Sequence, residues 1–291
     1  MRFSGTVSDF RHLTCGVPQG TKMGPLCFLI LINDALINTP FHWNYVDDST
    51  VGVTINNSSP NYNSLQDTLD RLIQWTTDNN VTINHNKSVV MHINTATTRV
   101  PPPAVTVGPH PLTVVSSTKL LGVTIDDKLD WKKHVATTVQ AATYRLYMLR
   151  RLKSLGAPSQ VLRDIYKCFI LPKLTYASPA WSSSLTVTQQ RQLEKVQKRA
   201  CKIILGTSYT TYDEALPTLR LSTLQDHHLH LLKQFGLKLL NNPRHRRMLP
   251  PDAPPPTRAV RHHNIIQPIR PRTDRYKKSP MPAIVNILNS A

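Results

Sequence analysis

Two adjacent aspartates, Asp47 and Asp48, lie between two short runs, 41–46 and 49–55, in which apolar and polar residues alternate. Such alternation is typical of strands, so the pattern predicts a β-hairpin with the acidic pair at its turn. Carboxylate oxygens held together at a turn can ligate hard divalent cations such as Mg²⁺ or Mn²⁺. Two such ions, roughly 3.5–4 Å apart, stabilise the attacking and leaving oxygens in phosphoryl transfer.

The elements around this turn must hold it in place. Upstream, the run GVPQG at 16–20 predicts a loop, because two glycines allow unusual backbone angles and a proline fixes one. A largely buried helix is expected over 25–36, and an amphipathic helix over 64–77, where four apolar residues share one face. Short strands are expected near 81–83 and 88–93, and a strand pair near 112–115 and 120–125, with a loop over 94–111.

From 132 to 241 the pattern is helical, with interruptions near 156–158, 172–179 and 206. Within 191–204 the apolar residues share one helical face, and the opposite face carries five cations, with Glu194 as the one acidic residue nearby. These cations are Arg191, Lys195, Lys198, Arg199 and Lys202. A solvated outer face would usually mix charge signs, so the pattern favours contact with phosphates over that alternative.

Charge is distributed unevenly along the chain, whose formal net charge is +18. Residues 1–100 carry 6 Lys and Arg against 7 Asp and Glu, whereas residues 101–291 carry 29 against 10. Such an excess indicates a polyanionic partner, either nucleic acid or an anionic membrane surface. Nucleic acid is favoured, because membrane binding would require a basic amphipathic helix without another apolar partner.

Composition narrows the class of protein further. The four cysteines, Cys15, Cys27, Cys168 and Cys201, have no metal-site spacing and are expected as free thiols. The first residues have no signal-peptide pattern, and no apolar run could span a bilayer. We therefore expect an intracellular protein, nuclear or cytoplasmic, with no membrane partner. Beyond residue 242 the chain is rich in Pro and Arg, which predicts a disordered basic tail.

The motifs occur in an order that resembles the palm of a reverse transcriptase of the LINE-like (non-LTR) retrotransposon kind, jockey- or CR1-like. The matching runs are GVPQGTKMGPLCF at 16–28, IND at 32–34, YVDD at 45–48, WTTDNNVTINHNK at 75–87 and KLLGVTIDDKLDW at 119–131. LPKLTYASPAW at 171–181 and VQKRA at 196–200 are similar to the thumb-side segment of such elements. A basic structural protein would match these runs only by chance.

This resemblance implies an α+β fold: a partial polymerase palm over 1–131, with an antiparallel sheet that includes the YVDD hairpin, then a helical thumb-like region over 132–242 and the tail over 243–291. It implies that Asp47 is the metal ligand of the hairpin, with Asp48 close by as the weaker contact, and that Tyr45 lies near the primer terminus. Pro18, Gln19 and Gly20 would lie beside the templating base and incoming nucleotide. Lys87 would lie near the nucleotide phosphates, and Leu121 and Gly122 would grip the primer.

Two of these roles have structural alternatives that the sequence leaves open. Lys87 could be a solvated lysine, and Gly122 could be needed only for a hairpin turn. The nucleic-acid contacts of the helical region would come from Lys195, Lys198, Arg199 and Lys202. The implied partners are an RNA template and a DNA primer, and the implied cofactor is Mg²⁺ or Mn²⁺.

The family's palm also takes a metal-binding aspartate from a strand well upstream of the Pro-Gln-Gly loop. Here Asp9 is the one acidic residue before that loop, and it is too close to it to fill that place. The resemblance therefore implies an incomplete two-metal site and a chain that does not polymerise alone, with the N-terminal part of the element as a possible partner. The alternative is a non-catalytic nucleic-acid-binding protein that uses the basic helical half.

Overall fold

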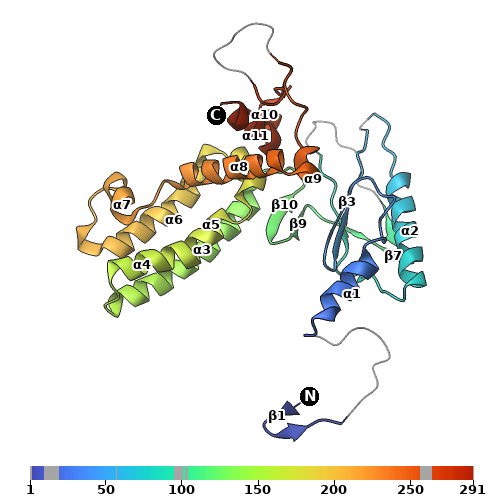
Figure 1. Ribbon diagram of the computed structural model, residues 1–291, viewed down its shortest axis with the longest axis horizontal. Coiled ribbons are helices and arrows are strands. Elements are labelled where there is room, and N and C mark those ends of the chain that lie inside the picture. The colour runs from blue at the N-terminus through green and yellow to red at the C-terminus, as the bar shows by residue number, and fades with distance from the viewer. Residues whose placement is uncertain are drawn as a thin grey trace. The chain divides into compact units, whose positions relative to one another are not determined.

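The computed structural model describes residues 2–9, 20–56, 58–94, 101, 104–255 and 264–290 (Figure 1). Its contacts divide the chain into two compact units, Met1–Ser116 and Ser117–Ala291. Residues 101–116 contain no Lys, Arg, Asp or Glu, so the second unit carries all 29 cations and 10 anions of the basic part of the chain. The charge asymmetry therefore coincides with the structural division. The boundary between the palm and the thumb-like region, placed after residue 131, remains a prediction.

The first unit combines two helices with short strand pairs. Its elements are β1 (Arg2–Phe3), β2 (Thr6–Val7), α1 (Met23–Ile32), β3 (His42–Tyr45), β4 (Asp48–Val51), α2 (Asn63–Asp78), β5 (Val89–Val90), β6 (Thr106–Val107), β7 (His110–Pro111) and β8 (Thr113–Val114). β1 pairs with β2, β3 with β4 and β6 with β7, all antiparallel, whereas β5 pairs with β8 in parallel. Each sheet within the described residues has two strands, where a larger antiparallel sheet was expected.

Several strand predictions for this unit were wrong in detail. Residues 81–83 form no strand, because the N–H of Val81 instead donates to the Thr76 carbonyl at the end of α2. The expected loop over 94–111 contains the β6–β7 pair. The predicted pair of 112–115 with 120–125 does not form. The strand near 112–115 pairs with β5 instead, a partner that local alternation of residues does not specify, and residues 117–126 form a hairpin of their own.

Helix α1 lies where its apolar run predicted a helix, but the prediction that it is largely buried was wrong. None of its residues is buried, and Leu29 and Ile30 are 54% and 69% exposed. The helix is apolar on every side, so burying it would take a covering element on each face, which the described residues of this unit do not provide. Within the described part of the chain, no helix is both long and apolar enough to cross a membrane.

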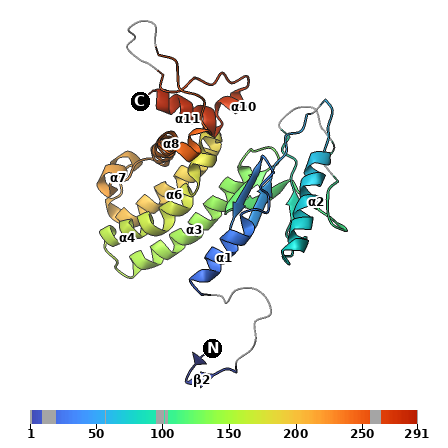
Figure 2. The ribbon, with the colours of Figure 1, turned by 45° about the vertical axis from the view of Figure 1, so that its right-hand side comes forward.

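The second unit begins with a hairpin and continues as a helical bundle, in which α3 and α6 lie side by side (Figure 2). Its elements are β9 (Ser117–Leu120), β10 (Val123–Asp126), α3 (Lys132–Ser154), α4 (Ser159–Ile165), η1 (Tyr166–Ile170), α5 (Leu171–Thr175), η2 (Ser178–Ala180), η3 (Ser182–Ser184), α6 (Val187–Leu205), η4 (Gly206–Ser208), α7 (Tyr212–Leu219), α8 (Leu224–Asn241), α9 (Pro243–Arg246), α10 (Asp274–Lys277) and α11 (Pro280–Asn289). The helices follow the predicted periodicity, including the breaks at 156–158 and 206.

The core of this unit centres on Trp181, which is fully buried. The rings of His134 and His228 meet it edge-on, with centroids 5.0 Å and 5.2 Å away. Burial lowers the pKa of His228 to about 4, so the imidazole is neutral near pH 7, and its Nε2–H donates to the Leu174 carbonyl at 3.1 Å. These contacts join α3, α5, α8 and the residue between η2 and η3 into one packed body.

The prediction of a disordered tail after residue 242 was wrong for most of that segment. α11 packs against α8, and Ile266, Ile284 and Leu288 are buried with Leu232 and Leu239 in a second small core. The side chain of Asn289 closes this segment by donating to the Ile266 carbonyl and accepting from its N–H. Although the segment is rich in Pro and Arg, its helix α11 has one apolar face, and that face is enough to pack the segment against α8.

Gly236 of α8 provides a test of this docking. A Cβ at Gly236 would lie 2.8 Å from the Cγ2 atom of Ile284, well inside van der Waals contact. In a solvated helix, Gly→Ala stabilises by roughly 1 kcal/mol. Because α11 is docked at this point, we expect Gly236→Ala to lower the free energy of unfolding instead, as measured by urea denaturation.

The control for this test is the same substitution in an Ile284→Ala background. Ile284→Ala removes the side chain beyond Cβ, including the Cγ2 methyl group that Gly236 faces, so Gly236→Ala should then be neutral or stabilising. A stabilising effect of Gly236→Ala in the parent chain would show that α11 does not pack there.

Candidate functional site

The β3–β4 hairpin places the acidic pair at its apex. Tyr45 is opposite Asp48 in the register, which leaves Val46 and Asp47 as the two turn residues. The turn is therefore shifted by one residue from the predicted Asp47–Asp48 turn, and Asp48 begins the second strand. Val46 has a φ of 53°, which is strained for a β-branched residue, and such strain often accompanies function.

The side chains of the apex are accessible. Asp47 and Asp48 are exposed, and Tyr45 and Trp43 on the preceding strand are 62% and 60% exposed. Trp43 lies against the backbone of Gly52, since a Cβ there would be 3.4 Å from its ring. The hairpin thus exposes two carboxylates and the aromatic side chains of Tyr45 and Trp43 for contact with a ligand.

The donor chemistry of Asp47 and Asp48 fits a hard divalent cation, because both side chains offer carboxylate oxygens. These two carboxylates are too few to complete a two-metal centre. Among the residues that the structure describes, no group of three or more His, Cys, Asp or Glu side chains could hold a metal ion. A complete centre would need at least one further carboxylate near this hairpin.

The predicted nucleotide-side loop is described only in part. Pro18 and Gln19 lie outside the described residues, and Gly20 is the first residue after that gap. Gly20 has a φ of +86°, in the region that favours glycine, and a Cβ there would meet nothing within 4 Å. Its backbone conformation agrees with a glycine turn, and the open space would permit a ligand to approach.

Lys87 lies in the turn between Asn84 and β5. Its backbone N–H donates to the carbonyl of Asn84 at 3.1 Å and to the Asn84 side-chain oxygen at 3.2 Å, and its side chain is exposed. In the described part of the chain, no hydrogen bond or ion pair joins Lys87 to Asp47 or Asp48. Both the phosphate role and the solvated-lysine alternative therefore remain open.

Leu121 and Gly122 form the two-residue turn between β9 and β10. Their φ angles are 45° and 87°, as a tight hairpin turn with two left-handed residues requires. The Tyr176 hydroxyl donates to the Leu121 carbonyl at 2.8 Å, and a Cβ at Gly122 would lie 3.2 Å from the Tyr176 ring. Tyr176 lies 55 residues away in the sequence, so no local pattern predicted this contact and only the fold reveals it.

We therefore expect Gly122→Ala to destabilise the second unit for two reasons. A left-handed non-glycine residue costs roughly 1–2 kcal/mol, and the new methyl group would also press on Tyr176. The matched control is Gly156→Ala, which has a similar φ of +85° but open space around its Cβ. In urea denaturation, the loss should be larger at Gly122 than at Gly156, and equal losses would show that the Tyr176 contact has no energetic weight.

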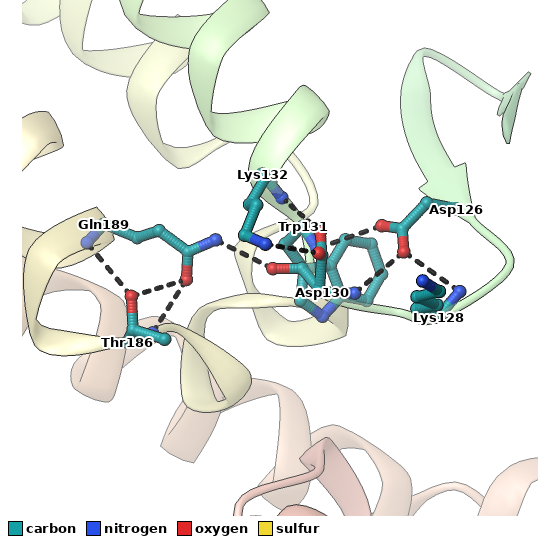
Figure 3. Close-up of polar contacts among 7 residues, drawn as sticks. All are labelled: Asp126, Lys128, Asp130, Trp131, Lys132, Thr186 and Gln189. Carbon is teal, nitrogen blue, oxygen red and sulfur yellow. Dashed lines mark hydrogen bonds and ion pairs between the residues drawn. The ribbon is translucent and has the colours of Figure 1, made fainter. Parts of the chain in front are cut away.

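The Asp126 side chain holds the loop between β10 and α3 by accepting hydrogen bonds from its backbone (Figure 3). One oxygen of its carboxylate accepts from the N–H groups of Lys128 and Asp130, and the other accepts from that of Trp131, at 2.9–3.1 Å. The Asp130 carbonyl then accepts from Gln189 Nε2 at 2.7 Å. Gln189 forms a capping box with Thr186, so this network ties the start of α3 to the start of α6.

Helix α6 separates its two faces as predicted. Leu193, Val196, Ala200 and Ile204 are buried, each 2% exposed or less. The opposite face is formed by the exposed side chains of Arg191, Lys195, Lys198, Arg199 and Lys202, which we call the α6 basic face. Within the described residues, none of these five cations forms an ion pair.

Glu194, the one acidic residue near this face, is committed elsewhere. Its carboxylate accepts from the Tyr212 hydroxyl and from the backbone N–H of Leu224 at 3.1 and 3.2 Å. Burial and the bond to Glu194 both raise the pKa of Tyr212, so its hydroxyl stays protonated and continues to donate. The basic face is therefore more strongly cationic than the sequence alone indicated.

Comparisons with known proteins agree with these features. A family model described as reverse transcriptase (RNA-dependent DNA polymerase) matches residues 1–125. The probable RNA-directed DNA polymerase from transposon X-element of Drosophila melanogaster is 26% identical over 236 residues, which cover 78% of this chain and 26% of the relative. No solved structure gives a significant match.

Two further relatives are also described as RNA-directed DNA polymerases of mobile elements. The RNA-directed DNA polymerase from mobile element jockey of Drosophila melanogaster is 25% identical, over 66% of this chain and 23% of the relative. A probable RNA-directed DNA polymerase from transposon BS of that fly is 23% identical over 72% of this chain and 24% of the relative. The chain thus spans about a quarter of the length of the curated relatives it matches. These matches support a reverse transcriptase of the LINE-like, non-LTR retrotransposon kind as the family of this chain.

Proposed function

We propose that this chain is the C-terminal part of a reverse transcriptase domain that carries out RNA-directed DNA synthesis by two-metal nucleotidyl transfer. The observation that carries the proposal is the exposed Asp47–Asp48 pair at the apex of a strained hairpin, within the segment that matches the family. When bound, Mg²⁺ or Mn²⁺ would supply the electrostatic stabilisation of the reacting oxygens. Asp47 and Asp48 would hold it.

In this proposal the remaining palm residues contact and position the primer, the template and the incoming nucleotide. Tyr45 lies two residues before Asp47 in the same hairpin, on the strand that leads to the apex, and would contact the primer terminus. Pro18, Gln19 and Gly20 would pass beside the templating base and nucleotide, and Lys87 would lie near the nucleotide phosphates. Leu121 and Gly122 would hold the primer on the β9–β10 turn, which Tyr176 supports from behind.

The α6 basic face would hold the backbone of an RNA template and a DNA primer. Lys195, Lys198, Arg199 and Lys202 are exposed and project from a helix whose other face is fixed in the core. Phosphate contacts of this kind position nucleic acid without reading its sequence.

We expect the chain by itself to extend no primer on an RNA template, in Mg²⁺ or in Mn²⁺. Its described residues offer the hairpin's two carboxylates and no group of three potential ligands, so a two-metal centre is incomplete without a carboxylate from elsewhere. The upstream part of the element's polypeptide is the proposed source. The measurement is incorporation of labelled nucleotide, and incorporation that disappears in Asp47→Ala would contradict this expectation.

A second candidate function is non-catalytic binding of nucleic acid by the second unit. The concentration of all 29 cations of the basic part in Ser117–Ala291 favours it, because this unit lacks the acidic hairpin and could act without it. The two functions differ in whether Asp47 ever supports incorporation of nucleotides.

A further inference from the structure

Helix α3 has an exposed face to which the proposed function, based on the β3–β4 hairpin and the α6 basic face, assigns no role. Tyr144, Tyr147 and Met148 are 72%, 61% and 47% exposed, and Arg151 is exposed beside them. Their spacing of i, i+3, i+4 and i+7 places them on one side of the helix. Leu155, 76% exposed, continues the row just after the helix ends. We call these five residues the α3 stacking face.

The charge around this face has one sign. The 23 residues of α3 include six Lys and Arg and no Asp or Glu. The acidic residues nearest in sequence are Asp130, paired with Lys132 at 3.1 Å, and Asp164, paired with Arg163 at 2.8 Å. Within the described residues the other five cations of α3 form no ion pair. A partner that lies on the face therefore meets uncompensated positive charge, which favours a polyanion over an acid-poor protein surface.

The opposite side of α3 is fixed. Val135, Ala142 and Leu149 are 1% exposed or less and pack in the core with α6. The exposed tyrosines therefore stand on a rigid helix, and their rise along its axis is about 4.5 Å for three residues. Rings held this way can stack on unpaired bases, and the exposed Arg151 guanidinium beside them can contact a phosphate.

We infer that the α3 stacking face binds single-stranded nucleic acid by stacking unpaired bases on Tyr144 and Tyr147. This goes beyond the proposed function, in which the helices of the second unit contact only the nucleic-acid backbone, through α6. A duplex keeps its bases stacked on each other, so it offers these rings no base faces. The face should therefore distinguish single strands from duplexes, which the α6 basic face alone does not.

The test uses the full chain and three fluorescein-labelled probes of equal length: single-stranded oligo(dT), an abasic strand with the same backbone, and a duplex. In the double variant Tyr144→Ala with Tyr147→Ala, we expect the affinity for oligo(dT) to fall at least about tenfold, with little change for the abasic strand or the duplex. Tyr→Trp at both positions should restore binding of oligo(dT). The matched control is Tyr276→Ala, an exposed tyrosine of α10, which should bind like the parent.

Each contrary result is informative. Equal losses on oligo(dT) and the abasic strand would overturn base stacking, while salt-dependent binding through α6 would still stand. An unchanged affinity for oligo(dT), together with a change of oligomeric state in light scattering, would show that the face binds a second copy of the chain. Because both rings are exposed, the melting temperature should not change, and a large drop would assign them a structural role instead.

Discussion

Changing Lys195, Lys198, Arg199 and Lys202 to Ala should flatten the salt dependence of nucleic-acid binding by this chain. Each phosphate neutralised on a single strand contributes about −0.7 to the slope of log K against log salt concentration. Four contacts therefore give a slope change of about 3. The structure supports the prediction because the four side chains are exposed and unpaired with acids within the described residues, and Glu194 is engaged by Tyr212 and Leu224.

The measurement is a titration of labelled RNA and single-stranded DNA at several salt concentrations. The matched control exchanges the four residues between Lys and Arg, which keeps the charge and should keep the slope. Lys198 and Lys202 also lie over the rings of Tyr212 and Tyr209, at 4.8 Å and 5.3 Å, so the stability of each variant must be checked. A slope near zero in the parent, or one unchanged in the quadruple variant, would mean that the α6 basic face is only solvated surface.

The parts of this fold that periodicity specifies could be predicted from the sequence. The one-sided apolar pattern of α2 and α6 needs only a core to face, and both helices lie within a few residues of their expected bounds. The hairpin at Asp47 also followed from alternation, although its turn is shifted by one residue. The glycine at 122 was assigned to a turn, and the left-handed φ gives the reason.

The features that could not be predicted depend on contacts between residues that are far apart in the sequence. α11 was hidden by the Pro and Arg around it, and only its contact with Gly236 and the rest of α8 shows why it folds. The inward direction of Glu194 depends on Tyr212, and the support of Gly122 depends on Tyr176. No local pattern contains these contacts. Conversely, the apolar run of α1 predicted burial that the described residues do not provide.

Activity that depends on Asp47 is the largest effect that the proposed function predicts. Removal of a carboxylate that holds a catalytic metal should lower nucleotide incorporation at least about a hundredfold, because the electrostatic stabilisation of the reacting oxygens is lost with it. Asp48→Asn should cost less, since Asp48 is assigned the weaker contact. Asp67→Asn, an exposed aspartate of α2, is the matched control and should have no effect.

The most direct test places this chain in the X-element polymerase, in exchange for the segment to which it is similar, and measures primer extension on an RNA template. We predict Mg²⁺-dependent extension by the chimera and its loss in Asp47→Ala, with Asp67→Asn as active as the parent chimera. Extension that persists in Asp47→Ala would contradict the assignment of the hairpin. A chimera that binds primer and template but extends nothing would favour the non-catalytic function.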